Sequence, residues 1–223
     1  MKIIDLSQTI HEGMPGHHTQ PPVGISPWSF HEGNTIPSAL MLQFSEHTGT
    51  HVDALSHMLP DKELPSIDRM SLENFIGEGL CLDVSRFEPG EFIEVSDLKQ
   101  AIDCTSVVLE QVNFVLLYTD HLRKNLNTSN AANNPGLSEE AALWLCKSGV
   151  KAFGVDAFAP GVKSKSNKRV HEICGETGVT HYENLTNLHE LVGKGIFTFI
   201  GFPLKIQSGT GSPVRAVALL QED

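Results

Sequence analysis

Three histidines and one aspartate lie within eleven residues near the start of the chain, and this stretch constrains the fold most strongly. It contains His47, His51, Asp53 and His57. Imidazole and carboxylate groups are costly to bury in an apolar interior unless a metal ion or a hydrogen-bond network engages their lone pairs. The chain must therefore bring these side chains together, and a metal site is the first hypothesis.

The residues between the first two histidines indicate how the chain runs there. Residues 48–50, Thr-Gly-Thr, are poor helix formers, so an extended or turning chain is favoured over the helix that carries paired histidines in zinc proteases. An extended chain over residues 45–53 places side chains two apart on one side. His47, His51 and Asp53 then face the same way, and the glycine lets the backbone approach an ion closely.

Two nitrogens, one oxygen and room for water are typical of a catalytic site for zinc, manganese or iron. His57 follows Asp53 by four residues and is either a fourth ligand or a general base beside the metal-activated water. Three protein ligands already complete an open catalytic site, which favours the general base. A hydrogen-bonded core cluster without metal is the alternative for the whole group.

Charge and cysteine usage restrict the partners and the compartment. The 223 residues carry a formal net charge of -11 at pH 7, which opposes binding to nucleic acid or to an anionic membrane. No apolar run is long enough for a signal peptide or a membrane span. The four cysteines form no CxxC pair and are expected to be reduced. We therefore expect a cytoplasmic, single-domain protein over residues 1–223.

The pattern of apolar runs predicts an α/β fold, because strands alternate with amphipathic helices. Strands are predicted over residues 2–6, 79–84, 113–119, 150–155, 179–183, 196–202 and 213–220. Helices are predicted from Ser96 as N-cap, from Ser138 to Gly149, and over residues 168–176. Asp156, directly after one predicted strand, stands where such folds gather functional groups.

The segment before the motif is predicted to form a lid followed by a strand. Residues 9–37 have little periodicity, and their apolar side chains need a surface to pack on: Met14, Trp28, Phe30 and Ile36. His17 lies in this lid and could reach a substrate. From residue 39 the sequence alternates, with Leu40 and Leu42 on one face, and this strand is expected to lead into the motif.

Two further residues of ligand type lie far along the chain. His171 falls in the predicted helix 168–176, and Glu183 ends the predicted strand 179–183. The residues alone leave alternatives open, since His171 could be an exposed helix residue and Glu183 a cap for the residues that follow.

Three stretches together resemble the cyclase family of metal-dependent hydrolases, to which bacterial kynurenine formamidase and isatin hydrolase belong. They are His-Thr-Gly-Thr-His-Val-Asp at residues 47–53 with His57, Glu-Asn-Leu-Thr-Asn-Leu at 183–188, and Gly-Ser-Pro-Val-Arg-Ala-Val at 211–217. The resemblance implies an α/β fold, a single swivelling β/β/α domain with a mixed sheet core, assembled as a homodimer or homotetramer. It also implies hydrolysis of a small-molecule amide, formamide, lactam or lactone bond.

The resemblance also implies roles for individual residues. His47, His51 and Asp53 match the ligands of a first ion, and His57 matches the proton donor and acceptor. Asp53 would bridge to a second ion held by His171 and Glu183, whose separation of twelve residues matches the family. One or two Zn²⁺ ions are expected, with Mn²⁺ as the alternative.

The chain departs from the family at positions that shape the substrate pocket. Asp120 and His121 stand where formamidases have Gly-Trp, His17 replaces an aromatic residue, and residues 157–161 read Ala-Phe-Ala-Pro-Gly in place of a Ser and an Asp. Metal chemistry is expected to transfer, whereas formamidase activity is left open. A metal-dependent binding protein without catalysis is the alternative, and the intact His57 argues against it.

Overall fold

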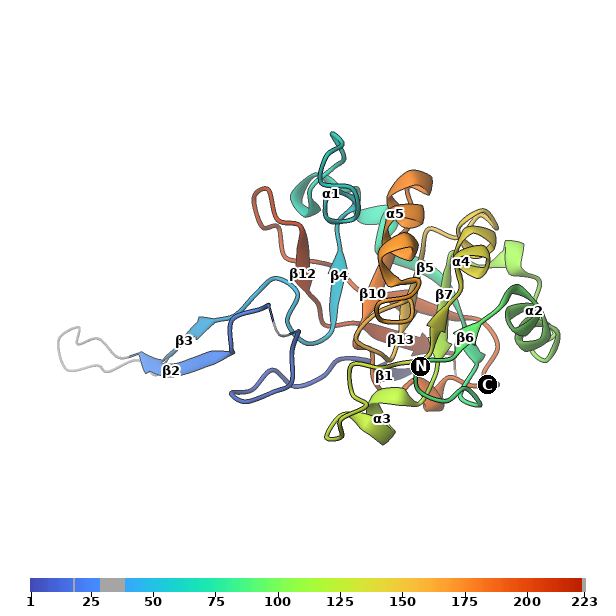
Figure 1. The fold of residues 1–223 in the computed structure, drawn as a ribbon, viewed down its shortest axis with the longest axis horizontal. Coiled ribbons are helices and arrows are strands. Elements are labelled where there is room, and N and C mark those ends of the chain that lie inside the picture. Colours follow the sequence, from blue (N-terminus) through green and yellow to red (C-terminus); the bar gives the residue numbers. More distant parts are fainter. Residues whose placement is uncertain (18, 29–38, 222–223) are drawn as a thin grey trace.

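A nine-stranded mixed sheet forms the centre of the computed structural model, which describes residues 1–17, 19–28 and 39–221 (Figure 1). The strand order is β1-β13-β11-β5-β7-β9-β10-β4-β12. Four neighbouring parallel strands occupy its middle: β5 (Ile76–Asp83), β7 (Phe114–Tyr118), β9 (Ala152–Val155) and β10 (Thr180–Glu183). Antiparallel strands extend it on both sides: β11 (Phe197–Ile200), β13 (Val217–Leu220), β1 (Lys2–Asp5), β4 (His51–Asp53) and β12 (Gly211–Pro213).

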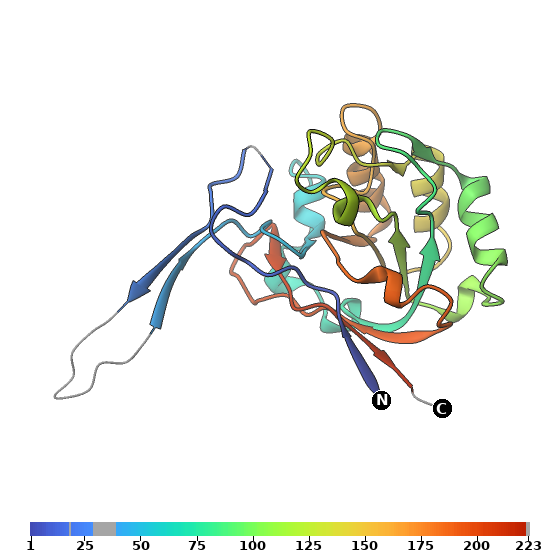
Figure 2. The same ribbon diagram turned by 90° about the horizontal axis from the view of Figure 1, so that it is seen from below.

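The parallel strands are buried because helices cover the sheet (Figure 2). All of β9 and β10 and the first four residues of β7 are buried, as expected for apolar runs in a parallel sheet. Four helices contact one another in series: α2 (Val95–Asp103), α4 (Glu139–Cys146), α5 (Asn167–Thr177) and α1 (Leu55–Met58). The predicted α/β fold with a mixed sheet core is therefore confirmed.

The remaining elements are short. They are α3 (His121–Asn125), the strands β6 (Phe92–Ile93) and β8 (Gly136–Leu137), and the 3₁₀ turns η1 (Ile67–Arg69), η2 (Leu72–Asn74), η3 (Leu109–Gln111) and η4 (Leu188–Glu190). None of the helices in the described residues has the length and hydropathy that a membrane span requires.

Most predicted elements are confirmed, with their ends shifted by a few residues, and two local predictions are wrong. Ser138 caps α4 as predicted, its side chain accepting from the backbone of Ala141. α2, however, begins at Val95, because Glu94 and Asp97 form a capping box that places the N-cap two residues before Ser96. The predicted strand 213–220 is divided between β12, which pairs with β4, and β13, which pairs with β11.

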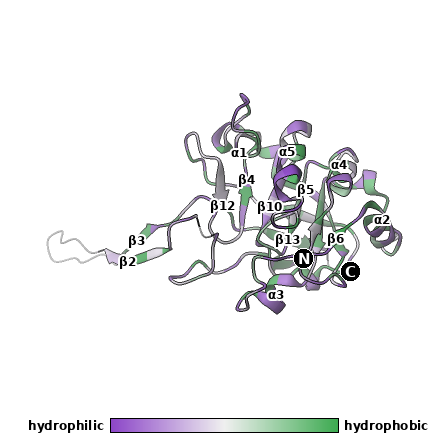
Figure 3. Cartoon of the chain, in the orientation of Figure 1, coloured by the Kyte–Doolittle hydropathy of each residue, from purple (hydrophilic) through white to green (hydrophobic). Residues whose placement is uncertain are grey.

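The strand predicted before the motif is present but ends at Gln43, before it reaches the motif. β3 (Ala39–Gln43) pairs with β2 (Gly24–Trp28) in a separate hairpin that extends away from the body (Figures 1 and 2). Leu40 is 61% and Leu42 53% exposed. The alternating pattern predicted the strand correctly, but it does not show whether another element covers either face of that strand. Figure 3 shows these apolar segments on the hairpin.

Of the apolar residues that were expected to pack on a surface, Met14 does so. The Met14 side chain lies 3.3 Å from where a Cβ at Gly49 would stand, so residues before β2 pack on the motif. Trp28, which was expected to pack on a surface, is exposed. Phe30 and Ile36 lie outside the described residues.

Candidate metal centre

Two adjacent antiparallel strands supply four side chains to one face of the sheet. The register places Glu183 of β10 opposite His51 of β4. Side chains two apart on a strand share a face, as do cross-strand partners, so Asp53 and His181 project on the same side as this pair. The sheet alone thus gathers two imidazoles and two carboxylates.

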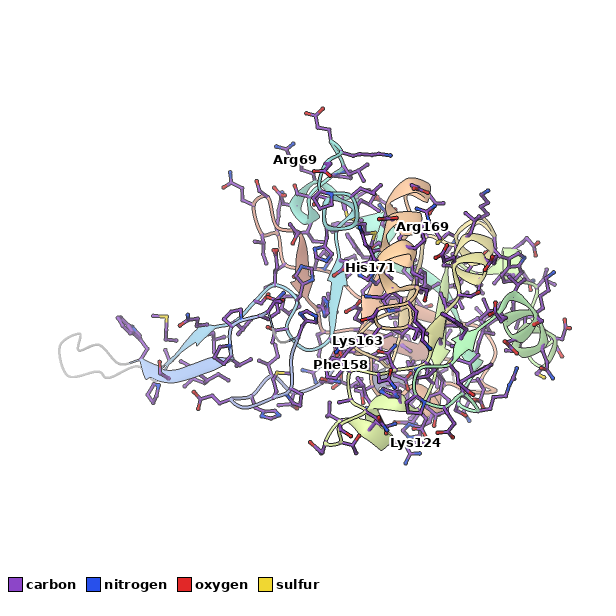
Figure 4. All side chains as sticks on the ribbon, in the orientation of Figure 1. Arg69, Lys124, Phe158, Lys163, Arg169 and His171 are labelled. Carbon is purple, nitrogen blue, oxygen red and sulfur yellow. The ribbon has the colours of Figure 1, made fainter. Side chains whose placement is uncertain are left out.

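Three further histidines approach this face from other segments. His57 lies on α1, and His171 extends from α5 toward β4 (Figure 4). His47 comes from a turn over residues 46–50, so the predicted extended chain over residues 45–53 is wrong before His51. The chain turns there because Gly49 has a φ of +60°, which glycine adopts without strain.

One oxygen of Asp53 faces the histidines of the motif. Asp53 Oδ1 lies 2.8 Å from His47 Nδ1 and 3.4 Å from His51 Nε2. The other nitrogen of each ring is held elsewhere, that of His47 by Thr210 Oγ1 at 3.0 Å and that of His51 by the carbonyl of Gly49 at 2.8 Å. Such contacts fix the ring orientation and are typical of metal-binding histidines. The Gly49 carbonyl therefore orients a ring, which was not predicted.

The other oxygen of Asp53 faces the histidines that follow later in the sequence. Asp53 Oδ2 lies 3.3 Å from His181 Nε2 and 3.7 Å from His171 Nε2. Glu183 Oε1 is at the same distances, 3.3 and 3.7 Å, from these two nitrogens. His171 Nδ1 lies 2.8 Å from the carbonyl oxygen of Asn167, which turns Nε2 toward the carboxylates. Asp53 thus offers one oxygen to each group of histidines.

The two buried carboxylates of the cluster, Asp53 and Glu183, require a positive charge beside them. Burial raises the pKa of Asp53, but the neighbouring imidazoles of His181, His47 and His51 outweigh this and hold it well below its ordinary value. Burial lowers the pKa of His181, but Asp53 and Glu183 outweigh this and raise it to about 10. A buried pair of carboxylates is stable only with positive charge beside it, supplied by a proton or by a metal ion.

The donor set fits a divalent metal. Ligand-type atoms lie within 4.8 Å of one another in two groups that share Asp53: His47, His51 and Asp53, and Asp53, His171, His181 and Glu183. Among the described residues, neither ring nitrogen of His181 has a hydrogen-bond partner, although the residue is fully buried. A buried imidazole that faces two carboxylates is a donor set that a divalent ion would satisfy.

His57 lies at the edge of the cluster. Its Nε2 is 3.8 Å from Asp53 Oδ2, and its side chain is 37% exposed, against 11% for His47. Burial lowers the pKa of His57; Asp53 raises it, and the neighbouring imidazoles of His47 and His171 lower it again, so the pKa falls below its ordinary value. A largely neutral ring that solvent can reach is suited to accept a proton.

The structure brings together six of the seven residues singled out in the sequence. His17 is the exception, because it is exposed and its Nδ1 lies 2.8 Å from Thr19 Oγ1, outside the groups around Asp53. His181 was missed, although the signal was present. It precedes Glu183 by two residues in the same predicted strand, and the two-residue period places both on one face.

Asp120, one of the positions that depart from the family, lies beside Asp156 at a cavity. Asp156 accepts hydrogen bonds from the backbone and hydroxyl of Thr119 and from the backbone of Asp120. Burial raises its pKa to about 7 against these hydrogen bonds, which lower it. Asp156 therefore ties the ends of β7 and β9 together. It lines, with Asp120 and Arg123, a cavity of about 320 Å³ beside residues 8–15.

A larger cavity of about 790 Å³ lies between α2 and α4. None of the residues in the two groups around Asp53 lines this cavity. The cavity is therefore not part of the candidate metal centre, although it is the larger of the two.

Comparisons with known proteins agree with this geometry. The model of a family described as "Putative cyclase" matches residues 4–162. Kynurenine formamidase of Bacillus cereus is 28% identical over 217 residues, 96% of this chain and 95% of that protein. Kynurenine formamidase of Bacillus cytotoxicus is 31% identical over 179 residues, 78% of this chain and 76% of that protein.

A solved structure agrees in fold. Isatin hydrolase A from Labrenzia aggregata, bound to benzyl benzoate, superposes with a TM-score of 0.86 at 24% identity, covering 99% of this chain and 94% of that one.

The geometry predicts that Asp53→Asn releases metal from both groups, because the substitution keeps the size of the side chain but removes the charge that both groups share. Elemental analysis of the gently purified variant should find little or no bound divalent metal. Asp156→Asn is the matched control, since it neutralises a buried aspartate outside the cluster and should retain the metal. Full metal content in Asp53→Asn would contradict the assignment.

Proposed function

The chain belongs to the cyclase family, and on that premise we propose that it is a metal-dependent hydrolase that opens an amide, formamide, lactam or lactone bond in a small molecule. One observation carries the proposal. Two groups of histidine and carboxylate side chains, each able to hold a metal ion, share Asp53, and the partly exposed His57 lies beside them. The relatives named above support it, since kynurenine formamidases and an isatin hydrolase are hydrolases of small-molecule C–N bonds.

The proposed ligands divide between two ions. His47, His51 and Asp53 would hold the first ion, and Asp53, His171 and Glu183 would hold the second. Zinc is the proposed metal because imidazole-rich sites suit it, whereas manganese prefers sites richer in oxygen. Manganese is the alternative.

The chain's own residues then account for the proton transfers. A divalent ion, when bound, lowers the pKa of water toward about 7 and polarises a substrate carbonyl. Asp53 keeps His47 and His51 in place through Oδ1. His57 accepts the proton of the attacking water at Nε2 and returns it to the leaving nitrogen or oxygen. Its exposed edge lets substrate and product exchange without movement of the buried cluster.

The substrate class follows from the relatives and is tested directly. Protein loaded with zinc or with manganese should hydrolyse an aryl formamide, a cyclic amide or a lactone, and prior treatment with a chelator should abolish the reaction. A metal-loaded protein that binds these compounds without turnover would instead be a metal-dependent binding protein. Hydrolysis that survives complete metal removal would also contradict the proposal.

His57→Gln is predicted to lower kcat by about 10²-fold or more, the usual contribution of a general acid and base, while metal content and fold stay unchanged. The reason is that the groups of histidines around Asp53 are complete without His57. Metal content and kcat should be measured on one preparation. Substantial loss of metal would make His57 a ligand, and unchanged turnover would remove it from the mechanism.

We further propose that the chain forms a homodimer or homotetramer through its hairpin. A two-stranded hairpin is marginally stable alone in water, and β3 exposes three consecutive apolar side chains, Leu40, Met41 and Leu42. A second copy of the chain would cover them.

The double variant Leu40→Lys and Leu42→Lys should therefore lower the molar mass in solution to that of a monomer, as measured by light scattering after size exclusion. Val108→Lys is the control, because Val108 is exposed on another surface and its substitution should leave the mass unchanged. A monomeric wild-type protein, or an oligomer unaffected by the double variant, would contradict the proposal.

We also propose that residues 1–223 act as one domain in the cytoplasm. Strands from both ends of the chain, β1 and β13, pair in the same sheet. The four cysteines are free, and three of them are buried, which supports a reducing compartment.

A further inference from the structure

We propose that His181 is a fourth protein ligand of the second ion, so that Asp53, His171, His181 and Glu183 enclose a zinc ion in a closed site. This inference rests on the proposed metal-dependent function and deepens it. The family resemblance assigns only Asp53, His171 and Glu183 to that ion, and nothing in it involves His181.

The distances from the two histidine nitrogens to the two carboxylates are close to the spacing that a tetrahedral ion requires. Two ligand atoms about 2.1 Å from a tetrahedral zinc lie about 3.4 Å apart. The distances from His181 Nε2 to the oxygens of Asp53 and Glu183 are both 3.3 Å, and those from His171 Nε2 are both 3.7 Å. His181 is thus closer to the required spacing than His171, which the resemblance already assigns.

The ring of His181 is completely buried. Its residue is 0% exposed, and within the described part of the chain neither ring nitrogen has a hydrogen-bond partner. The ring stacks on Phe153 with centroids 5.6 Å apart and meets His171 edge to face at 4.7 Å, so packing fixes its orientation. A buried imidazole with unused nitrogens is unfavourable where an aliphatic side chain would fit, unless a cation uses the lone pair.

Four protein ligands would make the two ions unequal. A zinc ion with four protein ligands has no open position, whereas the group of His47, His51 and Asp53 leaves one. Substrate and water would therefore meet only the first ion, and the second would hold Asp53 in place. A second imidazole also shifts the preference of the closed site toward zinc and away from manganese.

The test compares zinc binding by the wild-type protein and by His181→Leu. The leucine side chain fills the space of the imidazole ring but has no nitrogen to bind the ion. Zinc content is measured by elemental analysis, and the affinity of each ion by competition with a chelator. The wild-type protein should bind two ions per chain and lose one readily. In His181→Leu the affinity for the second ion should fall by at least a hundredfold, with the first ion unaffected. Manganese should not displace the second zinc from the wild-type protein.

His121→Gln is the control, because His121 is a buried histidine whose Nε2 faces the carbonyl oxygens of Asn130 and Ala131 instead of carboxylates. Its zinc content should match that of the wild-type protein. Cobalt substitution gives a second readout that needs no variant, since a four-coordinate cobalt ion absorbs visible light much more strongly than a six-coordinate one. The wild-type protein should show the intense spectrum for the second ion, and His181→Leu, checked for folding by circular dichroism, should lose it.

The inference is overturned if His181→Leu retains wild-type affinity for both ions. It is also overturned if the wild-type protein holds only one ion at zinc saturation and the His181 ring occupies the position proposed for the second ion. Either result leaves the proposed hydrolase intact with one or two ions. A wild-type protein that binds no metal would instead overturn the proposed function itself, together with this inference.

Discussion

The buried carboxylate of Asp53 is the interaction on which the arrangement of the chain depends. A charge in a protein interior is tolerated only when its partners are close and correctly oriented. The partners of Asp53 come from a turn, two strands and two helices, with three partners within residues 47–57 and two, His171 and His181, far along the chain. The fold therefore has to place five segments around one side chain, and small displacements of any of them would leave the charge uncompensated.

The sheet provides that precision through hydrogen bonds beside the cluster. The Thr180 hydroxyl donates to the backbone carbonyl of Asp53, which joins β10 to β4 next to the carboxylate. The Thr50 hydroxyl donates to the carbonyl of Asn184 at 2.6 Å, and the Asn184 side chain donates to the carbonyl of Gly49 at 3.1 Å. The turn that carries His47 is thus anchored to the strand that carries Glu183. Rigid supports of this kind keep ligand atoms in place before an ion arrives.

Local patterns predicted much of this structure, whereas features that depend on distant partners were missed. Apolar periodicity located the central strands and α5, and the strand period was enough to place His51 and Asp53 together. It could not show that Leu40 and Leu42 lie on an isolated hairpin, because alternation does not identify the surface that covers a strand. The separation of β12 from β13 depends on which neighbours each finds in the sheet. The two-residue spacing of His181 and Glu183 was overlooked, because it indicates a site only once the opposing strand with His51 and Asp53 is known.

The sharing of Asp53 has a thermodynamic consequence. One carboxylate presents Oδ1 to one group of histidines and Oδ2 to the other. An ion that occupies either side restricts rotation of the carboxylate and withdraws electron density from it. The first effect makes binding on the other side easier, and the second makes it harder. If both ions bind as proposed, their occupancies are linked unless these two effects cancel, and by reciprocity each ion then alters the affinity for the other by the same factor.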